Sequence, residues 1–379
     1  MGGKQSAAVQ DKHVVVIGGG YGGIVVALKL QGKCKLTLID PKEAFHHCIG
    51  ALRACTEDGF ARKTLIPYAP TFGESFKRGT VEAIDPGAKK VRLAGGEDIG
   101  YDYLVVATGS RGSFPSKISG GEDSSVYINQ YTDMLQKIKA CKDIVVIGGG
   151  AVGVEMAGEI TTDFSDKQVT LIHSRDYLVE GDFSPKFRRG AEEQLRAKGV
   201  KLVLGEKVTN LADLPTDGSS RCTVKTDKGT EVEADLVLVC VGQPCNSSAY
   251  AASLSDRVEG TGHLKVNKYL QVEGLDDVFA IGDCCNIHQL KLAYFAGQHG
   301  ELVAKNLQLL AQGKTDLKAW PAPGRMMALP VGRNGGVFQL GSMVFGPFLA
   351  RKVKSEGLFI ARYWSEMKQK EPKAVDVEV

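Results

Sequence analysis

One short pattern occurs twice in this chain, and it limits the fold more than any other feature. Each copy is a β-branched run followed at once by G-x-G-x-x-G, first over residues 18–23 and again over residues 148–153. The first glycine permits a tight bend, the second lets backbone N–H groups approach a pyrophosphate, and the third lets helix pack on strand. Two copies, each continuing into a further strand, favour a protein that binds two dinucleotides.

The residue that follows the second strand of each unit helps to predict the nucleotide. Asp40 lies about 20 residues beyond Gly18, the spacing expected for a carboxylate that bonds an adenosine ribose. The corresponding strand of the second unit ends instead in His173-Ser174-Arg175. A carboxylate there favours NADH, whereas an arginine tolerates the 2′-phosphate of NADPH. The sequence therefore leaves NADH and NADPH both open.

Three further apolar strands end in turns that suit the same architecture. The first two end in Ala107-Thr108-Gly109 and in Val241-Gly242. The third ends in Ile281-Gly282-Asp283, whose carboxylate can bond a flavin ribityl hydroxyl. A helix predicted to begin near Leu292 would aim its N-terminus at the flavin ring. Glu155, early in the helix after the second glycine turn, either favours the helix dipole or reaches the nicotinamide end.

Composition argues against several classes of protein. The 379 residues allow two or three domains, and a net charge of only +3 gives no basic field for nucleic acid. The nine cysteines contain no C-x-x-C pair and no secretory signal is recognised, so we expect reduced thiols in a cytosolic setting. No apolar run is long enough to span a membrane, since Gly, Pro, Asn and Gln interrupt the uncharged segment 334–350.

The first six residues fit M-G-x-x-x-[ST], the pattern for N-myristoylation of Gly2. The alternative is a polar start that matches a loose pattern by chance. One myristoyl chain holds a membrane only marginally, so a second contact is needed. We expect the tail from Arg325 onward to supply it, because apolar residues there mix with Arg351, Lys352 and Lys354. Otherwise the tail is a small domain whose apolar residues form its own core or a dimer interface.

Together these turns resemble those of the two-dinucleotide-binding flavoprotein reductases, over roughly residues 12–315. Five short segments are also similar to apoptosis-inducing-factor homologues, which in turn resemble type II NADH dehydrogenases. These segments are Phe45 to His47, Ala51 to Ala54, Gly153 to Ala157, Thr170 to Ser174 and Asn246 to Tyr250. With the acylation motif and the short tail, the resemblance spans nearly the whole chain.

The resemblance implies an α/β fold with two Rossmann-like domains of the glutathione-reductase type, the second inserted in the first. The expected FAD-binding domain comprises residues 12–120 and 265–320, and the expected NAD(P)H-binding domain comprises residues 121–264. Residues 1–11 are expected to form a flexible N-terminus. Residues 321–379 are expected to form a short C-terminal α+β domain associated with membrane and quinone.

The resemblance also implies an FAD-dependent NAD(P)H:quinone oxidoreductase on the cytoplasmic side of membranes, such as the plasma membrane and lipid droplets, and partly in the cytosol. Such an enzyme reduces ubiquinone and vitamin K or menaquinone-type quinones to radical-trapping hydroquinones. By position, FAD would be held by Gly18, Gly19, Gly20, Tyr21, Gly22, Gly23, Asp40, Lys42, Arg53, Val81, Ala107, Thr108, Gly109, Gly282, Asp283 and Ala293. NADH or NADPH would be held by Gly148, Gly150, Val152, Gly153, Glu155, His173 and Gly242. Loss of Glu155 would damage hydride transfer most.

Histidines and cysteines near position 47 offer other chemistry. His46 and His47 lack a further metal-ligand pattern, so we predict no metal site and expect them to line the flavin pocket or cap a helix. Reductases of this architecture that act on disulfides or peroxides carry a reactive cysteine near Cys48, but six residues separate Cys48 from Cys55, unlike their redox pair. A Cys48-dependent thiol or peroxide reductase stays an alternative, as does an NAD(P)H-responsive signalling or DNA-associated protein. Cys48, Cys285 and Arg175 depart from the family pattern.

Overall fold

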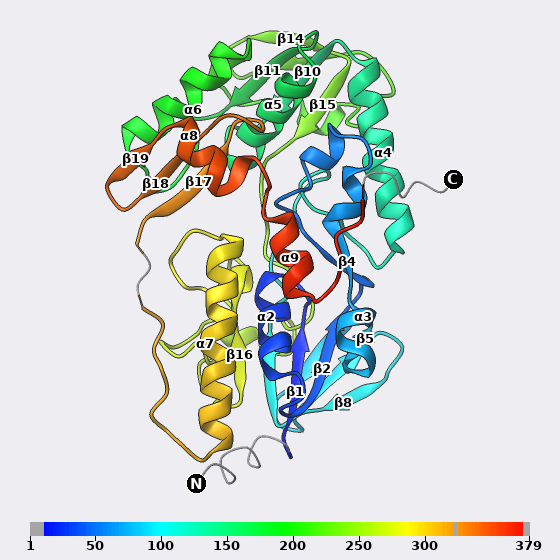
Figure 1. Cartoon of the computed structure of the whole chain (residues 1–379), viewed down its shortest axis with the longest axis vertical. Coiled ribbons are helices and arrows are strands. Elements are labelled where there is room, and N and C mark those ends of the chain that lie inside the picture. Colours follow the sequence, from blue (N-terminus) through cyan, green and yellow to red (C-terminus); the bar gives the residue numbers. More distant parts are fainter. Residues whose placement is uncertain (1–10, 322–323, 374–379) are drawn as a thin grey trace.

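The computed structural model describes residues 11–321 and 324–373, which form two lobes with the C-terminal segment lying across both (Figure 1). The first lobe contains a parallel sheet in the order β16-β9-β1-β2-β5. Its strands are β1 (His13–Ile17), β2 (Lys35–Asp40), β5 (Phe76–Arg78), β9 (Tyr103–Val106) and β16 (Val278–Ala280). Helices α2 (Tyr21–Leu30) and α7 (Ala293–Ala311) pack against each other. Strands β1, β9 and β16 are nearly continuous apolar runs because the middle of a parallel sheet of this kind is buried on both faces.

The second lobe repeats this plan with a parallel sheet in the order β12-β11-β10-β15. Its strands are β10 (Asp143–Ile147), β11 (Gln168–His173), β12 (Lys201–Leu204) and β15 (Leu236–Val239). Its remaining elements are helices α4 (Ser124–Ala140), α5 (Ala151–Asp163) and α6 (Pro185–Ala197), and a hairpin of β13 (Cys222–Lys225) and β14 (Glu231–Ala234).

Pairing within the first sheet shows that the second lobe is inserted in the first. Strand β16 pairs in parallel with β9, with Phe279 opposite Val105, although the whole second lobe lies between them in the sequence. The chain therefore leaves the first sheet after β9 and returns to it with β16. The predicted fold class is confirmed.

Shorter elements occupy the connections. They are β3 (Ala44–His46), β4 (Leu65–Pro67), α3 (Ala69–Phe72), the antiparallel strands β6 (Val81–Asp85), β7 (Lys90–Leu93) and β8 (Asp98–Gly100), and single turns of 3₁₀ helix at Arg53–Cys55, Phe60–Thr64, Gly73–Ser75, Leu211–Asp213, Ser255–Arg257 and Gly282–Cys284. The alternating sequence pattern from residue 77 to residue 98 is typical of a small β-meander. The structure has that meander, but Lys77 and Arg78 belong to β5, which extends the parallel sheet beside β2.

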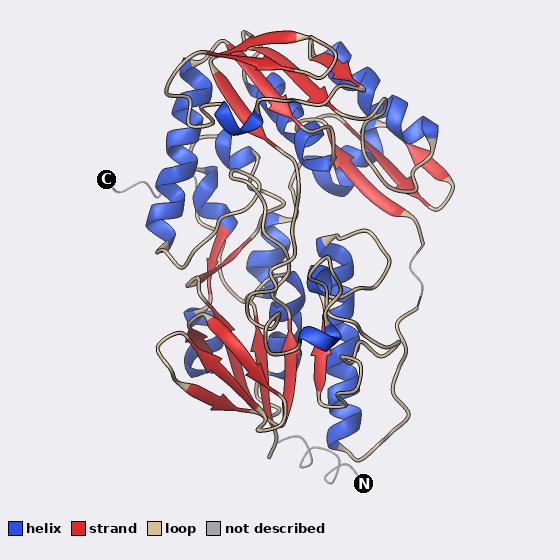
Figure 2. Cartoon of the chain, turned by 180° about the vertical axis from the view of Figure 1, so that it is seen from behind, coloured by secondary structure: helices blue, strands red, loops and turns tan. Residues whose placement is uncertain are grey.

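The C-terminal segment contacts both lobes. Residues 312–321 run along the outside of the first lobe (Figure 2). The antiparallel strands β17 (Met326–Pro330), β18 (Gly336–Leu340) and β19 (Met343–Phe345) then pack beside α5 and α6. After α8 (Pro347–Ala350) and a π-helical turn, η7 (Arg351–Ser355), helix α9 (Ile360–Glu366) lies beside α2 in the first lobe (Figure 1). The segment thus bridges the two lobes.

Two glycines bring this segment against the second lobe backbone to backbone. A Cβ added to Gly158 of α5 would lie 2.7 Å from the backbone nitrogen of Gly332, so no side chain fits between the helix and the turn after β17.

In the parts of the chain that the structure describes, no helix has both the length and the apolar character required to cross a membrane.

Candidate active site

The first glycine turn (residues 18–23) joins β1 to α2 and has room for a ligand at one glycine only. A Cβ on Gly18, whose φ is +98°, would lie 2.4 Å from the carbonyl oxygen of Ala107, and a Cβ on Gly23 would lie 1.8 Å from that of Gly18. At Gly20 a Cβ would meet no atom within 4 Å. Packing of the chain therefore excludes any side chain at Gly18 and Gly23, whereas Gly20 faces the open space that a pyrophosphate requires.

The second glycine turn (residues 148–153) joins β10 to α5 in the same way. A Cβ on Gly148, whose φ is +112°, would lie 2.6 Å from the carbonyl oxygen of Cys240, and one on Gly153 would lie 1.8 Å from that of Gly148. Gly150 again faces open space, since its added Cβ would meet nothing within 4 Å. Both turns therefore fit a dinucleotide, each at the carboxyl end of a parallel strand.

Asp40 lies at the first glycine turn, as its position in the sequence predicted. The residue is 4% exposed, and its carboxylate accepts hydrogen bonds from the backbone N–H of Gly19 at 2.8 Å and of Lys42 at 2.9 Å. The Lys42 ammonium adds an ion pair at 3.1 Å. Tyr68 also contacts the first glycine turn, because its hydroxyl donates to the Gly19 carbonyl at 2.7 Å. Sequence reasoning missed Tyr68, which comes from a loop with no motif.

Asp283 lies where β16 ends, and two residues from the linker after β9 contact it. The hydroxyl of Ser110 donates to the Asp283 carboxylate at 2.5 Å, and the Lys117 ammonium lies 3.5 Å from it. Helix α7 begins at Ala293, close to the predicted start. Backbone N–H of Gly282 donates to Nδ1 of His299 at 3.1 Å, so this buried imidazole fixes the turn that carries Asp283. Neither Ser110 nor Lys117 could be found from spacing.

Glu155 is held by a lysine from the C-terminal segment. It lies on α5, is 8% exposed, and accepts a hydrogen bond from the Lys354 ammonium at 2.8 Å. Burial raises the pKa of the Glu155 carboxyl, and the positive charge of Lys354 opposes that rise. The pair lies at a point where the tail meets the second lobe.

Arg53, for which a contact with FAD was predicted, is buried between α5 and the C-terminal segment. Its side chain is 2% exposed and forms two parallel hydrogen bonds to Glu159 of α5, at 2.8 Å and 3.0 Å. The same guanidinium donates to the carbonyl oxygens of Ser355 at 2.6 Å and Glu356 at 2.9 Å. Because these bonds engage the guanidinium, Arg53 here ties the first lobe, α5 and the tail together.

An aromatic cluster closes the site beside the first glycine turn. The rings of Tyr21, Phe45, His47 and Tyr363 lie 4.7–6.1 Å apart, and Tyr363 belongs to α9. Nε2 of His47 contacts the Leu358 carbonyl at 2.7 Å, so this nitrogen carries the proton and Nδ1 accepts from the Tyr21 hydroxyl at 3.2 Å. Burial lowers the pKa of His47 to about 4, which keeps the ring neutral.

His46 contacts helix α4, where its Nε2 lies 3.0 Å from the Tyr131 hydroxyl, and burial lowers its pKa to about 3. In the described ranges, no group of three or more His, Cys, Asp or Glu side chains could hold a metal ion. All nine cysteines fall within those ranges and are free thiols. Cys48 contacts the Tyr21 hydroxyl at 3.7 Å.

A small recess beside the second glycine turn brings Val152 and Gly242 together with the linker residues Ser113 and Ser116. Val152 and Gly242 were both predicted to hold NAD(P)H, whereas the two serines were not predicted. The ring of His173 packs on Gly149, and its Nε2 is buried without a hydrogen-bond partner. Two other predicted residues lie away from this recess or outside the structure. Val81 is buried at the start of β6. The predicted acylation site at Gly2 lies outside the described residues.

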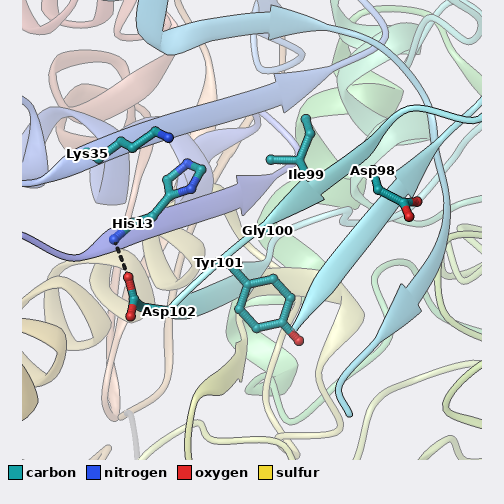
Figure 3. Close-up of a pocket in the computed structure, with 7 residues that line it drawn as sticks. All are labelled: His13, Lys35, Asp98, Ile99, Gly100, Tyr101 and Asp102. Atoms are coloured by element: carbon teal, nitrogen blue, oxygen red, sulfur yellow. Dashed lines mark hydrogen bonds between the residues drawn. The ribbon is translucent and has the colours of Figure 1, made fainter. Parts of the chain in front are cut away.

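A larger recess of about 500 Å³ lies at the opposite edge of the first sheet (Figure 3). It is lined by His13, Lys35 and residues 98–102, where β1 and β2 begin, and the backbone N–H of His13 donates to Asp102 at 2.7 Å. Ligands of open parallel sheets bind at the carboxyl ends of the strands. This recess is therefore separate from the dinucleotide site.

With this geometry in view, comparison with known proteins decides the family. Residues 12–300 match the family described as pyridine nucleotide-disulphide oxidoreductase. The chain belongs to that family. Members bind FAD and NAD(P)H, so the predicted cofactors are confirmed, and the open positions at Gly20 and Gly150 fit two dinucleotides. The protein is thus an NAD(P)H-dependent flavo-oxidoreductase.

Relatives named ferroptosis suppressor protein 1 extend the match over nearly the whole chain, which confirms the predicted resemblance. The protein of Taeniopygia guttata is 43% identical over 362 residues, which are 95% of this chain and 97% of the relative. That of Homo sapiens is 41% identical over 374 residues, 98% of this chain and 100% of the relative. The solved sulfide:quinone oxidoreductase of Aquifex aeolicus shares the fold, with a TM-score of 0.77 at 22% identity, covering 97% of this chain and 96% of that chain.

Proposed function

We propose that this flavo-oxidoreductase reduces ubiquinone and vitamin K-type quinones to radical-trapping hydroquinones at the cytoplasmic side of membranes, and thereby suppresses lipid peroxidation and ferroptosis. The relatives named ferroptosis suppressor protein 1 support the biological role. The observation that carries the proposal is in the tail. One short segment holds both Lys354, which pairs with Glu155, and Phe348, which is 79% exposed. A lipid-soluble acceptor needs such a connection between a membrane and the hydride site.

The chain's own residues provide binding, orientation and a dry site. When bound, NAD(P)H supplies a hydride and FAD accepts it and passes two electrons to the quinone. Glu155, held by Lys354, would orient the nicotinamide end of the bound NAD(P)H. The aromatic cluster around Tyr21 and Tyr363 excludes water beside the first. Lys354 also holds protons at Nζ where a reduced quinone would take them up.

The competing thiol mechanism requires a second cysteine or an activated thiolate. Six residues separate Cys48 from Cys55, and burial raises the pKa of the Cys55 thiol well above its ordinary value, so Cys55 is a poor partner. Cys48→Ser separates the two mechanisms. We expect quinone reduction to survive this change. Loss of quinone turnover together with loss of peroxide or disulfide turnover would favour the thiol mechanism instead.

The main test is direct. The purified protein should show a flavin spectrum and oxidise NADH or NADPH much faster when a short-chain ubiquinone is added. A protein that binds FAD and consumes nicotinamide nucleotide, but passes no electrons to ubiquinone or a vitamin K-type quinone, would overturn the proposed acceptor. A protein that stays colourless after reconstitution with FAD would challenge the cofactor itself.

Membrane contact is proposed for two places. One is the acylation motif at Gly2. The other is an apolar patch at the edge of the second lobe, formed by Leu340, Met343 and Phe348, which are 43%, 56% and 79% exposed, with Lys352 nearby on η7. Leu340 and Met343 are register partners in β18 and β19, so they lie side by side.

Liposome flotation tests this arrangement. Gly2→Ala and the pair Met343→Ser with Phe348→Ser should each weaken flotation of the acylated protein, and together they should abolish it, because one acyl chain holds a membrane only marginally. Tyr294→Ser removes an exposed aromatic residue from α7 and serves as the control. Unchanged flotation of the combined variant would exclude both contacts.

A further inference from the structure

Helix α5 carries three carboxylates at intervals of four residues, a spacing that places them along one face of the helix. They are Glu155, Glu159 and Asp163. Each carboxylate pairs with a cation from a segment that is distant in the sequence. The partners, in the same order, are Lys354, Arg53 and Arg333, at 2.8 Å, 2.8 Å and 2.6 Å. This face of α5 is therefore held at three successive turns by side chains from outside the helix.

Arg333 binds two carboxylates at once. It lies in the turn after β17, and its guanidinium donates to Asp163 at 3.1 Å and 2.6 Å and to Glu57 through another nitrogen. The Asp163 side chain is 13% exposed, and those of Arg333 and Glu57 are 32% and 34% exposed. Solvent and salt screen charges at this depth less than charges at an open surface, and the forked contact with Asp163 fixes the geometry.

Glu57 connects this cluster to the first lobe. It lies between β3 and β4, four residues after Arg53, and its backbone N–H donates to the Arg53 carbonyl at 2.9 Å. The same connection begins at His47, whose ring belongs to the aromatic cluster beside the first glycine turn. The connection between β3 and β4 therefore reaches α5 twice, once through Arg53 and once through Arg333.

We propose that Arg333 positions the second glycine turn for hydride transfer, because it binds Asp163 of α5 and Glu57 together and so fixes the direction of the helix. The second glycine turn begins α5, and Glu155 lies about 12 Å along the helix axis from Asp163. A small rotation of α5 would therefore shift the nucleotide on the second turn with respect to the first turn. A misplacement of about 1 Å can cost on the order of a hundredfold in rate. The inference rests on hydride transfer from nicotinamide to flavin and not on the proposed electron acceptor.

Anaerobic stopped-flow reduction of the flavin at several NADH concentrations tests the proposal. Arg333→Gln should lower the limiting reduction rate by about tenfold and change the apparent Kd for NADH by less than about twofold, because only the alignment is lost. Arg333→Lys should recover part of the rate. Glu57→Gln and Asp163→Asn should each lower the rate several-fold. Together they should lower it no further than Arg333→Gln, because all three variants break the same cluster.

Hydrogen exchange of the protein without NAD(P)H gives a readout that does not depend on turnover. In Arg333→Gln, the amides of residues 158–164 and 331–335 should exchange at least about tenfold faster, because the end of α5 and the turn after β17 are no longer held together. The amides of β1 and β10 should keep the protection of the parent protein, which would show that both sheets remain folded.

Arg92→Gln is the matched control, since the Arg92 side chain is 61% exposed and pairs with Asp98 within the β7–β8 hairpin. It should change neither readout. An unchanged limiting rate in Arg333→Gln, even with a lower thermal midpoint, would overturn the proposal, and so would a loss explained by weaker NADH binding alone. If Arg333→Gln fails to fold, Glu57→Gln and Asp163→Asn decide in its place. None of these measurements uses a quinone, so failure of the proposed acceptor and failure of this proposal are distinguishable.

Discussion

The two glycine turns of this protein share their backbone and differ in what surrounds it. A Cβ added to Gly23 or to Gly153 would lie 1.8 Å from a carbonyl oxygen in both cases. Gly20 and Gly150 both face open space. Around the first turn stand the carboxylate of Asp40 and the hydroxyl of Tyr68. Around the second turn stand His173 and a loop with no acid at the strand end.

The helices that follow the two turns differ as well. Two residues past the turn, α2 has Val25, which packs against Gly300 of α7, whereas α5 has Glu155, which pairs with Lys354 of the tail. The first helix faces an apolar neighbour and the second faces a polar junction. The backbone of both turns suits a pyrophosphate, whereas the side chains supplied by neighbouring elements differ between them. We therefore expect these neighbours to determine which nucleotide each turn binds and which turn lies beside the hydride transfer.

The largest expected effect is the loss of one cofactor function when a methyl group is added at the packed glycine of one turn. Gly23→Ala should abolish FAD binding and destabilise the first lobe by about 3 kcal/mol, because the added methyl group meets the Gly18 carbonyl. Gly153→Ala should leave the flavin spectrum in place and abolish flavin reduction by NAD(P)H. Visible spectra and thermal unfolding measure both. If Gly153→Ala released FAD instead, the two turns would not have separate ligands.

Gly20→Ala and Gly150→Ala complete this test, since an added methyl group at either position meets no protein atom. Both variants should fold with the stability of the parent protein and still bind their own dinucleotide more weakly, because the methyl group takes the space of the pyrophosphate. Unimpaired binding in either variant would contradict the assignment of that turn.

A second prediction tests the difference between Val25 and Glu155. Glu155→Gln should lower the rate of flavin reduction by on the order of a hundredfold, because the nicotinamide loses the carboxylate that orients it. The flavin content should not change. Stopped-flow reduction at several NADH concentrations separates the rate from the binding. Val25→Ala is the matched change in the first helix, and it should leave the reduction rate within about twofold.

A third comparison concerns the next helical turn, where Glu159 and Lys29 stand at equivalent places. Glu159 pairs with buried Arg53, whereas Lys29 pairs with Glu301 at 3.0 Å on the surface, with both side chains about half exposed. Glu159→Gln should destabilise the protein by about 3–5 kcal/mol, because a buried guanidinium loses its partner. Lys29→Met should cost less than about 1 kcal/mol. Urea unfolding measures both, and equal losses would show that Arg53 is not buried in solution.

The smallest expected effect is a pH dependence that arises from the buried residues His46 and His47. Burial lowers the pKa of His46 to about 3 and that of His47 to about 4. Between about pH 6.5 and these values, the two imidazoles are therefore protonated in the unfolded chain but neutral in the folded chain. Stability from this source is fully present above about pH 6.5 and is lost as the pH falls toward 4. FAD release should therefore begin in that range. His47→Gln should reduce the pH dependence, and His288→Gln, at an exposed histidine, should not change it.

The sequence by itself determined the two glycine turns and the buried parallel strands, whereas the insertion of one domain in the other was implied by the family resemblance and appears in the pairing of β16 with β9. The turns and strands follow from short-range rules, because glycine spacing and β-branched runs act within a few residues of each other. The positions of Asp40, Asp283 and Glu155 could be predicted for the same reason, since each lies at a fixed distance from a turn or at a strand end.

Only the tertiary structure decided which side chains surround those positions. Lys354 donates a hydrogen bond to Glu155, the Tyr68 hydroxyl donates to the Gly19 carbonyl, and Arg53 donates to Glu159. No local pattern predicts these pairs, because partners far apart in the sequence meet only through the packing of whole elements. The physical reason is that backbone rules are local, whereas a buried charge must find its partner wherever the folded chain places one.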